Sequence, residues 1–278
     1  MRAISFVLSL MILSYTIYWV SEKRPDVKSS ISEALSSGSF HTLEARFSAE
    51  QIMENASSKL LKNETYDYLE PELQFQPYLL MEVKFSREET MTGEGIILWD
   101  LMDGEMVVET QDWNKSHGFA DCLLARADKQ EFKVINALAR GGGFIDRNSL
   151  LHSLNIEDEL LDSYLESCRR KKLIVPTGNG FRLHFEDPLL NIKPATIIDA
   201  PIVTKHFRYA KRLPRRFTPA EVMNLAEAAF GSDFAIRRTL TVYLPIYVIT
   251  VQNPDGSLRT TYWNALNGKQ LENSPYLD

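Results

Sequence analysis

The chain has 278 residues, of which 44% are hydrophobic and 24% are charged. This composition excludes wholesale disorder, and the length allows two or three domains of about 100 to 200 residues each. The formal net charge of -6 argues against a protein that mainly coats nucleic acid, and the two cysteines lack the C-x-x-C spacing of a zinc or thiol redox site.

An apolar segment near the N-terminus, residues 4–20, carries no charged side chain and follows Arg2. A helix of this length rises about 26 Å, near the lower limit for crossing a bilayer. Tyr and Trp residues gather at its end, and no small-residue cleavage pattern follows. We therefore predict that residues 1–21 form a single-pass membrane anchor, with a cleaved signal peptide as the alternative. The Ser-rich residues 22–46 are predicted to form a tether, and the side of the membrane on which the soluble part lies stays undecided.

Two regions of the chain, residues 47–112 and 217–278, begin alike. The sequence FSAEQIM opens the first region at Phe47, and FTPAEVM opens the second at Phe217. In each, a Ser or Thr stands three residues before a Gln or Glu, which is the spacing of a capping box. Each region is therefore predicted to begin with a helix.

After this helix, each region has a run of aromatic and β-branched residues with one proline inside it, Pro77 in the first and Pro245 in the second. Such runs are typical of strands, and a proline, which cannot donate to the ladder, is expected at an edge or a bulge. A turn and a returning strand follow, so each region is predicted to be a helix and a small antiparallel meander. The equivalent structural positions in the returning strands are Trp99 and Gly104 in the first region and Trp263 and Gly268 in the second.

The pattern of a capped helix, P-x-Y-V-I-T-V and W-N-A-L-N-G-K resembles the PepSY domain, whose last strand typically carries Asp-Ala, one residue and Thr-Gly before an apolar position. Those places are taken here by Asn264, Ala265, Asn267 and Gly268, and less completely by Asp100 and Gly104 in the first region. The resemblance covers residues 217–271 well and residues 47–107 weakly, and the tryptophans and the asparagines depart from it. It implies small modules outside the cytoplasm or on membranes, with binding or inhibitory rather than catalytic roles.

Residues 120–187, between the two regions, have a different pattern. Three helices are predicted: one ends at the glycines that start with Gly141, a short one is capped by Asp146, and a longer one begins near Glu157. The segment LIVPTGNGFRLHF then predicts a hairpin. This order resembles a winged helix. The predicted fold class is α+β, with two helix-and-meander modules flanking a winged-helix domain and a transmembrane helix at the N-terminus.

A winged helix invites a DNA-binding hypothesis, because its third helix can enter the major groove. The first half of that helix is acidic in this chain, and carboxylates repel the phosphate backbone. The acidic residues are Glu157, Asp158, Glu159, Asp162 and Glu166. A structural or protein-contacting role is therefore preferred, and nucleic acid is a disfavoured partner.

Residues 188–216 are predicted to be a linker that ends in a basic arm. The segment KHFRYAKRLPRR has no acidic residue, and aromatic residues stand between its cations. The cations are Lys205, Arg208, Lys211, Arg212, Arg215 and Arg216. They are the candidate polyanion contact, for which an anionic membrane surface, nucleic acid and the protein's own acidic helix stay open. A solvated linker without such a contact is the remaining alternative.

Catalytic motifs are weak in this sequence. The five histidines lack the H-x-x-x-H or H-E-x-x-H spacing of a metal site. The acidic residues Asp100, Asp103 and Glu105 miss the alternation of a calcium loop and are predicted to shape a turn. The chain is therefore predicted not to be an enzyme and to need no cofactor or metal.

The preferred function is a noncatalytic, membrane-tethered interaction or assembly protein that binds another protein of unknown identity. The alternative from another class is a membrane-tethered, DNA-binding transcriptional regulator that uses the winged helix and the basic arm. Peptidase inhibition or chaperoning is a third hypothesis, and it comes from the PepSY resemblance alone.

Overall fold

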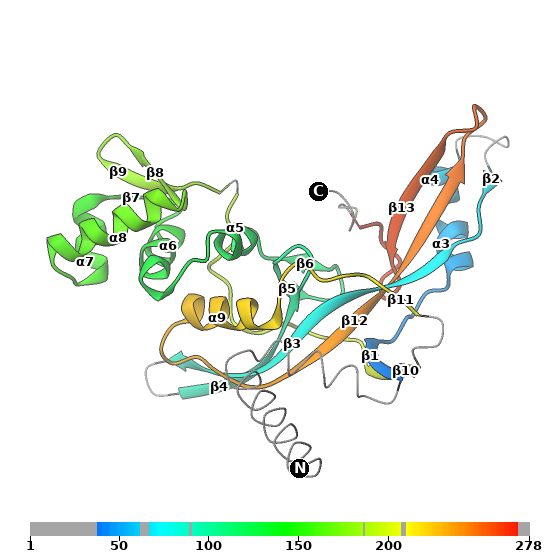
Figure 1. The fold of residues 1–278 in the computed structure, drawn as a ribbon, viewed down its shortest axis with the longest axis horizontal. Coiled ribbons are helices and arrows are strands. Elements are labelled where there is room, and N and C mark those ends of the chain that lie inside the picture. Colours follow the sequence, from blue (N-terminus) through cyan, green and yellow to red (C-terminus); the bar gives the residue numbers. More distant parts are fainter. Residues whose placement is uncertain (1–37, 62–66, 89–90, 186, 207–209, 272–278) are drawn as a thin grey trace, which may run out of the picture.

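A computed structural model of the chain describes residues 38–61, 67–88, 91–185, 187–206 and 210–271. The fold is α+β: one large twisted sheet of ten strands carries helices, and a helical unit with its own three-stranded sheet projects from one end (Figure 1). The predicted membrane segment, residues 4–20, lies outside the described residues. Within the described ranges, no helix has both the length and the apolar character needed to cross a bilayer.

The large sheet is built around two long strands, β3 (Glu72–Glu88) and β12 (Ala235–Gln252). Its other strands are β1 (Ser39–Leu43), β2 (Asp67–Tyr68), β4 (Met91–Asp100), β5 (Met106–Glu109), β6 (Asn114–Lys115), β10 (Ile202–His206), β11 (Lys211–Arg212) and β13 (Leu258–Asn264). The strand order is β10-β1-β12-β3-β4-β5-β6, with β2 and β13 paired to β12 and β11 paired to β3. The two central strands therefore come from the two sequence repeats, which we call the first copy (47–112) and the second copy (217–278).

The two copies meet around a pseudo-twofold axis at the centre of the sheet. β3 and β12 are antiparallel, and Gln76 lies opposite Leu244. Each of these residues directly precedes the proline of its own copy. The flanking pairs are Pro77 with Tyr243 and Phe75 with Pro245. Each flanking pair joins the proline of one copy to an aromatic residue of the other, as a twofold relation requires.

The returning strands have the same register in both copies. Trp99 of β4 lies opposite Leu79, and Trp263 of β13 lies opposite Tyr247. In each case the partner stands two residues after the proline of the same copy. The two meanders are therefore equivalent pair by pair, although the β3–β4 hairpin is longer than the β12–β13 hairpin.

The helices cross over between the copies. The first copy contains α3 (Ala49–Asn55) and the short α4 (Ser57–Leu60), and the second contains α9 (Pro219–Phe230). Just before α9, the amide of Phe217 donates to the carbonyl of Leu101 at 2.9 Å. Just before α3, the amide of Phe47 donates to the carbonyl of Ala265 at the same distance. Each helix therefore starts on the meander of the other copy.

The hydrophobic cores follow the same crossing. Ile52 of α3 belongs to a cluster with Ile249 and Trp263, which are residues of the second copy. Val222 of α9 belongs to the large cluster that contains Trp99. The predicted regions 47–112 and 217–278 are thus repeats of sequence but not separate packing units. The strand that precedes each helix explains this crossing. β1, before α3, pairs parallel with β12 of the second copy, and β11, before α9, pairs parallel with β3 of the first copy.

The prolines lie in the central strands, whereas an edge or a bulge was predicted. On one side of β3, pairing with β11 ends at Phe75 and pairing with β4 begins at Tyr78. Pro77 stands in the gap between these partners, and its carbonyl accepts from the amide of Leu101 at 3.1 Å. A missing N–H costs little where no ladder acceptor faces it. Pro245 stands in the equivalent gap of β12.

Two segments that were predicted as connections are parts of the sheet. The predicted tether, residues 22–46, contains β1, in which Leu43 is fully buried. The predicted linker, residues 188–216, contains β10 and β11, and the hydroxyl of Thr196 hydrogen-bonds the backbone of both β4 and β5. The strands in both segments are short and partly polar. They form by pairing with strands that are distant in the sequence, so local composition does not predict them.

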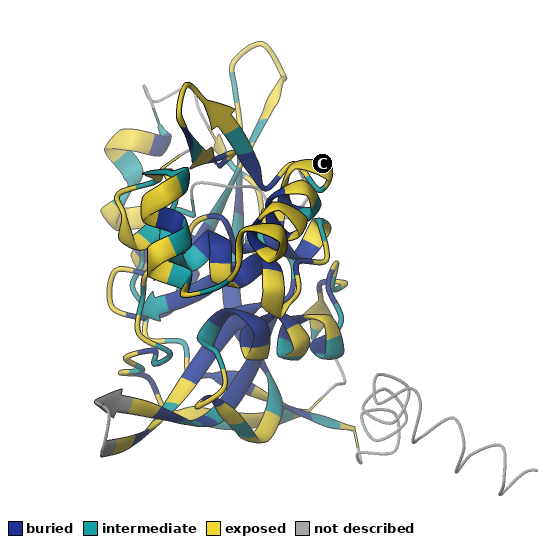
Figure 2. Ribbon diagram, turned by 90° about the vertical axis from the view of Figure 1, so that its left-hand side faces the viewer, coloured by how far each residue is buried: buried dark blue, intermediate teal, exposed yellow. Residues whose placement is uncertain are grey.

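The helical unit follows the first meander. It contains α5 (Phe119–Leu124), α6 (Lys129–Arg140), α7 (Arg147–Leu154), α8 (Asp158–Arg170), β7 (Phe144–Asp146), β8 (Ile174–Thr177) and β9 (Gly180–Leu183), with strand order β7-β9-β8. Its core is continuous with the core between α9 and the large sheet. Figure 2 looks from the side of this unit and shows the buried residues concentrated where helices face one another and the sheet.

Candidate functional site

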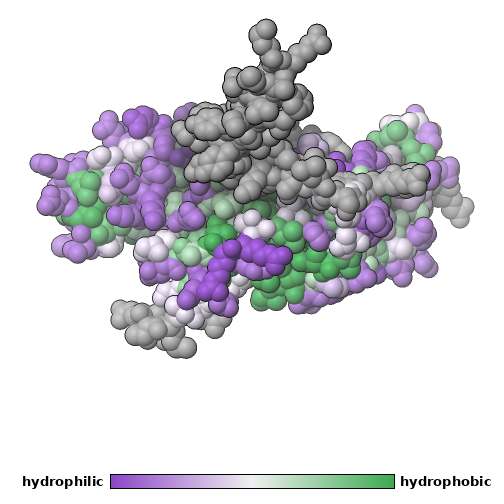
Figure 3. Space-filling model, turned by 60° about the horizontal axis from the view of Figure 1, so that its bottom comes forward, coloured by the Kyte–Doolittle hydropathy of each residue, from purple (hydrophilic) through white to green (hydrophobic). Residues whose placement is uncertain are grey.

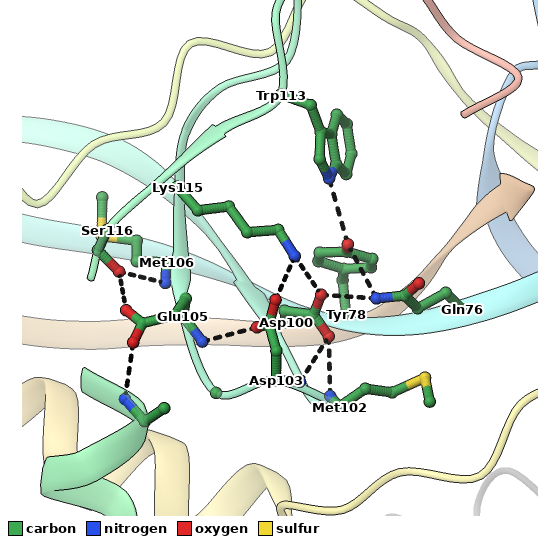
Figure 4. A network of polar contacts seen from close by, with 12 residues as sticks. Gln76, Tyr78, Asp100, Met102, Asp103, Glu105, Met106, Trp113, Lys115 and Ser116 are labelled. Carbon is green, nitrogen blue, oxygen red and sulfur yellow. Dashed lines mark hydrogen bonds and ion pairs between the residues drawn. The ribbon is translucent and has the colours of Figure 1, made fainter. Parts of the chain in front are cut away.

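A buried polar network lies at the end of β4, where the first copy reverses direction. Asp100, which is fully buried, accepts from the amide of Met102 at 2.8 Å through Oδ1. Its Oδ2 accepts from Gln76 Nε2 and from Lys115 Nζ, both at 2.6 Å (Figure 4). The carboxylate of Asp100 therefore links the turn to the central strand β3 and to β6, the strand at one end of the sheet order.

Lys115 is the cation of this network. Its ammonium contacts the carboxylate of Asp103 at 2.5 Å as well as that of Asp100, and it lies 5.6 Å from the centre of the Tyr78 ring. The Tyr78 hydroxyl accepts from Gln76 Nε2 at 3.2 Å and from Trp113 Nε1 at 3.3 Å. Asp100 is fully buried whereas Lys115 and Asp103 are partly exposed, and a buried charge such as that of Asp100 is stable only when it is paired and hydrogen-bonded.

The network holds two carboxylates and a single ammonium, and this imbalance perturbs its acid–base properties. Burial, together with the neighbouring charge of Asp100, raises the pKa of Asp103 to about 6. Burial alone would lower the pKa of Lys115, but Asp100 and Asp103 outweigh it and hold that pKa well above its usual range. Burial raises the pKa of Tyr78 well above its usual range, so the phenol stays neutral.

Glu105 connects the same turn to the helical unit. Its carboxylate accepts from the amide of Gly118 at 2.8 Å, from the amide of Ala120 at 3.0 Å and from the hydroxyl of Ser116 at 2.5 Å. These amides are at the start of α5, where backbone donors lack helical partners. A second link joins Asn136 of α6 to the carbonyl of Ala229 in α9 at 2.8 Å. The helical unit is therefore held at two separate points, one on the turn after β4 and one on α9.

The geometry gives this network a structural role. The oxygens of Asp100, Asp103 and Glu105 bond the backbone of the turn or of the segment that follows, so these residues shape a turn, as predicted. A carboxyl with a pKa near 6 suits general acid catalysis only if it faces a substrate. The cleft of about 530 Å³ between the α5–α6 connection and α9 is lined by other residues, among them Leu123, Lys129 and Glu227. The carboxyl group with the raised pKa, that of Asp103, is therefore not among the residues that line this cleft.

The repeated positions occupy equivalent turns. Trp99 is fully buried and Trp263 is 4% exposed, and Gly104 and Gly268 both have positive φ, +86° and +69°. The indole of Trp99 donates to the carbonyl of Gly104 at 2.8 Å, whereas the indole of Trp263 donates to a threonine hydroxyl on its own strand. The backbone of the turn is thus shared, and the hydrogen bonds of the indoles differ.

The second copy lacks the charges of the first. Asn264 and Asn267 stand where the first copy has Asp100 and Asp103, and they accept the same turn amides, from Leu266 at 2.8 Å and from Lys269 at 3.0 Å. Asn264 is fully buried, and its Nδ2 has no hydrogen-bond partner among the described residues. The charged network is therefore a property of the first copy alone within the described chain.

The structure distributes the cations of the predicted basic arm along the sheet. Lys205 of β10 lies 5.6 Å from the centre of the Phe75 ring, and Arg212 of β11 lies 5.8 Å from that of Tyr243. Lys211 pairs with Glu72 at 2.7 Å. The remaining members are Arg215 and Arg216, beside the start of α9, and Arg208, which lies outside the described residues. Arg216 also lies 5.5 Å from the centre of the Phe217 ring, so at least four of the six cations lie against the protein's own rings and carboxylates.

The acidic residues of α8 lie mainly on its exposed face. Glu159 and Glu166 are exposed, and so are Asp158 and Asp162, which pair with Arg147 at 2.6 and 2.7 Å. Figure 3 shows another face of the molecule, its underside, where hydrophobic side chains form a broad area beside a hydrophilic stripe. The exposed surface thus combines acidic and hydrophobic areas.

Sequence reasoning missed Lys115, Gln76 and Tyr78 as members of the network. No local pattern marks Lys115, because its partners stand more than ten residues away in the sequence. The described residues contain no group of three or more His, Cys, Asp or Glu side chains that could hold a metal ion. Comparisons of the chain with protein-family models, with curated proteins and with solved structures found no match.

Proposed function

We propose that this chain is a noncatalytic, membrane-tethered interaction protein that docks another protein on its helical unit. The tether is proposed from the apolar residues 4–20, and the two copies are proposed to be PepSY-like. In the helical unit, α6, α7 and α8 with the sheet β7-β9-β8 are interpreted as a winged helix that serves as a docking surface.

The acidic exposed face of α8 is the observation that carries the proposal. In a DNA-reading winged helix, the third helix approaches phosphates and bases, so its exposed face needs positive or neutral charge. In this chain Arg147 is the cation that pairs with this face, and Glu159 and Glu166 have no ion pair in the described structure. A basic surface on a partner protein complements such a face, and a nucleic acid does not.

The hydrogen bonds of Glu105, which link the turn after β4 to the start of α5, support the same proposal. A docking unit transmits binding to the rest of the molecule only if it is held in a defined orientation. The carboxylate of Glu105 anchors the helical unit to the turn after β4, and the side chain of Asn136 anchors it to the backbone of α9. The contacts of Lys205 and Arg212 with aromatic rings also occupy part of the surface on which a DNA-binding arm would rely.

The test is a charge reversal on α8 in the full-length chain. The double variant Glu159→Lys with Glu166→Lys leaves the ion pairs of Arg147 in place, and Glu227→Lys on the exposed side of α9 is the matched control. Crosslinking in native membranes is expected to give a discrete complex that the double variant loses and the control keeps. Tight binding of the wild-type chain to random duplex DNA, with a steep salt dependence that Arg212→Glu and Arg215→Glu abolish, would instead establish the DNA-binding regulator.

A further inference from the structure

Within the described chain, the large sheet carries helices on one face. α9 packs there in the cluster that contains Trp99, and α3 packs there in the cluster that contains Trp263. The strand registers place both tryptophans on the same face of the sheet, and side chains alternate between the faces along each strand. The opposite face, which we call the lower face, holds the cluster around Leu80 and Leu244. No member of that cluster belongs to a helix among the residues that the structure describes.

The lower face has exposed apolar side chains beyond this cluster. Three of them are Ile96 of β4, Leu240 of β12 and Ile202 of β10. Each stands two residues before a cluster member on its own strand or opposite a cluster member on the next strand. Ile96 and Ile202 are each 40% exposed, whereas the solvated face of an antiparallel sheet is usually polar. Figure 3, which shows the underside of the molecule, has a broad hydrophobic area, and exposed areas of this kind mark contacts with proteins or membranes.

The chain enters the sheet beside this area. β1 begins at Ser39, and the register of His41 with Val242 places Ser39 beside Leu240. The proposed membrane anchor ends at residue 20, so residues 21–38 join it to β1. A segment of this length spans at most about 60 Å when fully extended. Tethering of this kind gives the lower face a high effective concentration at the lipid surface, so that even a weak contact is populated.

We propose that the lower face, at Ile96, Leu240 and Ile202, rests on the surface of the lipid bilayer to which the chain is tethered. Its apolar side chains enter the boundary between headgroups and acyl chains, as those of interfacial apolar surfaces do. The helical unit with α8 projects from one end of the sheet, so a docked partner and the bilayer contact different parts of the molecule (Figure 1). This inference rests on the membrane tether of the proposed function and adds a second contact with the same membrane.

The charges beside the apolar area are paired with one another. Arg238 lies 3.6 Å from the carboxylate of Glu82, and Arg237 lies 2.9 Å from that of Glu94. These four residues carry no net charge together, so the contact is expected to come from the apolar side chains and not to require anionic lipid. Vesicles of phosphatidylcholine alone are therefore the appropriate probe.

The test uses the full-length chain reconstituted in phosphatidylcholine vesicles that contain a doxyl-labelled lipid as a quencher. One fluorophore is attached in Thr204→Cys, at an exposed position of the lower face, and a control fluorophore in Glu227→Cys, on α9. The native cysteines are buried, so labelling is expected at the introduced cysteine. Quenching is expected to be about twofold stronger at position 204, because an interfacial apolar face enters the headgroup boundary by about 5 to 10 Å.

Charge substitutions on the lower face test whether its apolar side chains carry the contact. Ile96→Glu is expected to reduce quenching at position 204 to the level of the control, because a carboxylate opposes entry into the apolar layer. Leu124→Glu, on α5, is the matched control, since Leu124 is 58% exposed, and it is expected to leave quenching unchanged. Ile202→Glu repeats the test at a second position in case Ile96→Glu does not fold.

Equal quenching at positions 204 and 227 would overturn the inference, and so would quenching that both Ile96→Glu and Ile202→Glu leave unchanged. A fluorophore at position 204 that is shielded from water but not quenched would show that protein covers the lower face, which also overturns the inference. Shielding that grows with the ratio of protein to lipid would then identify a second copy of this chain. A chain that alkaline carbonate removes from the vesicles would lack the proposed tether, whereas a chain that stays without quenching at position 204 would lack the contact of the lower face alone.

Discussion

Gln76 and Leu244 occupy the same position in the two sequence copies, and they lie opposite each other in the large sheet. This pairing places the two repeats in one continuous β-structure around a pseudo-twofold axis. Each helix then packs on the meander of the other copy. Within this arrangement the turn of the first copy holds a charged network, which the described part of the second copy lacks.

The two turn glycines are expected to differ in their sensitivity to substitution. A Cβ at Gly104 would lie 2.8 Å from the Phe217 ring and 3.0 Å from Leu123, whereas at Gly268 the nearest contact is Phe47 at 3.2 Å. Both positions have positive φ, which disfavours alanine. We expect Gly104→Ala to lower the free energy of unfolding by about 3 kcal/mol and Gly268→Ala by about 1 kcal/mol. Urea denaturation measures both, and equal losses would contradict the difference in packing.

Removing the ammonium of Lys115 is expected to be costly because Asp100 is fully buried. The variant Lys115→Met leaves two carboxylates without a cation, and we expect it to lower the free energy of unfolding by about 3 kcal/mol. Adding Asp100→Asn, which copies Asn264 of the second copy, is expected to restore part of that loss. The measurement is urea denaturation of the single and double variants.

The surface pair between Lys269 and Asp112 provides the control for that experiment. Both of its side chains are more than half exposed, so Lys269→Met is expected to change the free energy of unfolding by less than about 1 kcal/mol. If Lys115→Met were as mild as this surface variant, the network would not hold the turn.

Asp103 is expected to make stability depend on pH. Its pKa in the folded protein, about 6, is above its ordinary value of 3.8, so the folded state binds the proton more tightly than the unfolded state. Its contribution to stability is therefore complete below pH 3.8 and is lost as pH rises through 6. Because the side chain is 37% exposed, solvent screening limits the effect to about 1 kcal/mol.

The variant Asp103→Asn isolates this pH effect, since Asn267 forms the same turn in the second copy. The difference in unfolding free energy between pH 4 and pH 7 is expected to shrink in this variant and to stay unchanged in Asp112→Asn. A wild-type difference that Asp103→Asn does not alter would show that another group titrates in this range.

The two cysteines are expected to be unreactive in the folded protein. Cys122 and Cys168 are free and buried, and burial raises the pKa of Cys168 to about 12 and that of Cys122 well above its usual range. Thiolates are the reactive species, so a disulfide reagent at pH 8 is expected to label neither residue until denaturant is added. Rapid labelling of the native chain would contradict this burial.

Local features of the fold were predictable from the sequence. Ser48 and Thr218 both form capping boxes, with Gln51 and Glu221, because capping depends on residues only three positions apart. The acidic residues of the first turn were likewise expected to shape it.

The crossing of the helices was not predictable from the sequence. Both helices have similar apolar faces, and each meander has a buried tryptophan, Trp99 or Trp263. Local patterns therefore do not show whether a helix packs on the meander of its own copy or on that of the other copy. The choice depends on β1 and β11, which pair with strands of the other copy. The partners of Lys115 were missed for the same reason, because strand order brings them together.

The central claim is that each helix packs on the meander of the other copy, and a pair of double-mutant cycles tests it most directly. Ile52→Ala is combined with Trp263→Phe in one cycle and with Trp99→Phe in the other, and unfolding free energies are measured in urea. Ile52 shares a cluster with Trp263 and not with Trp99, so the account predicts a coupling of about 1 kcal/mol in the first cycle and additivity in the second. Coupling between Ile52 and Trp99, with additivity toward Trp263, would contradict the crossed arrangement.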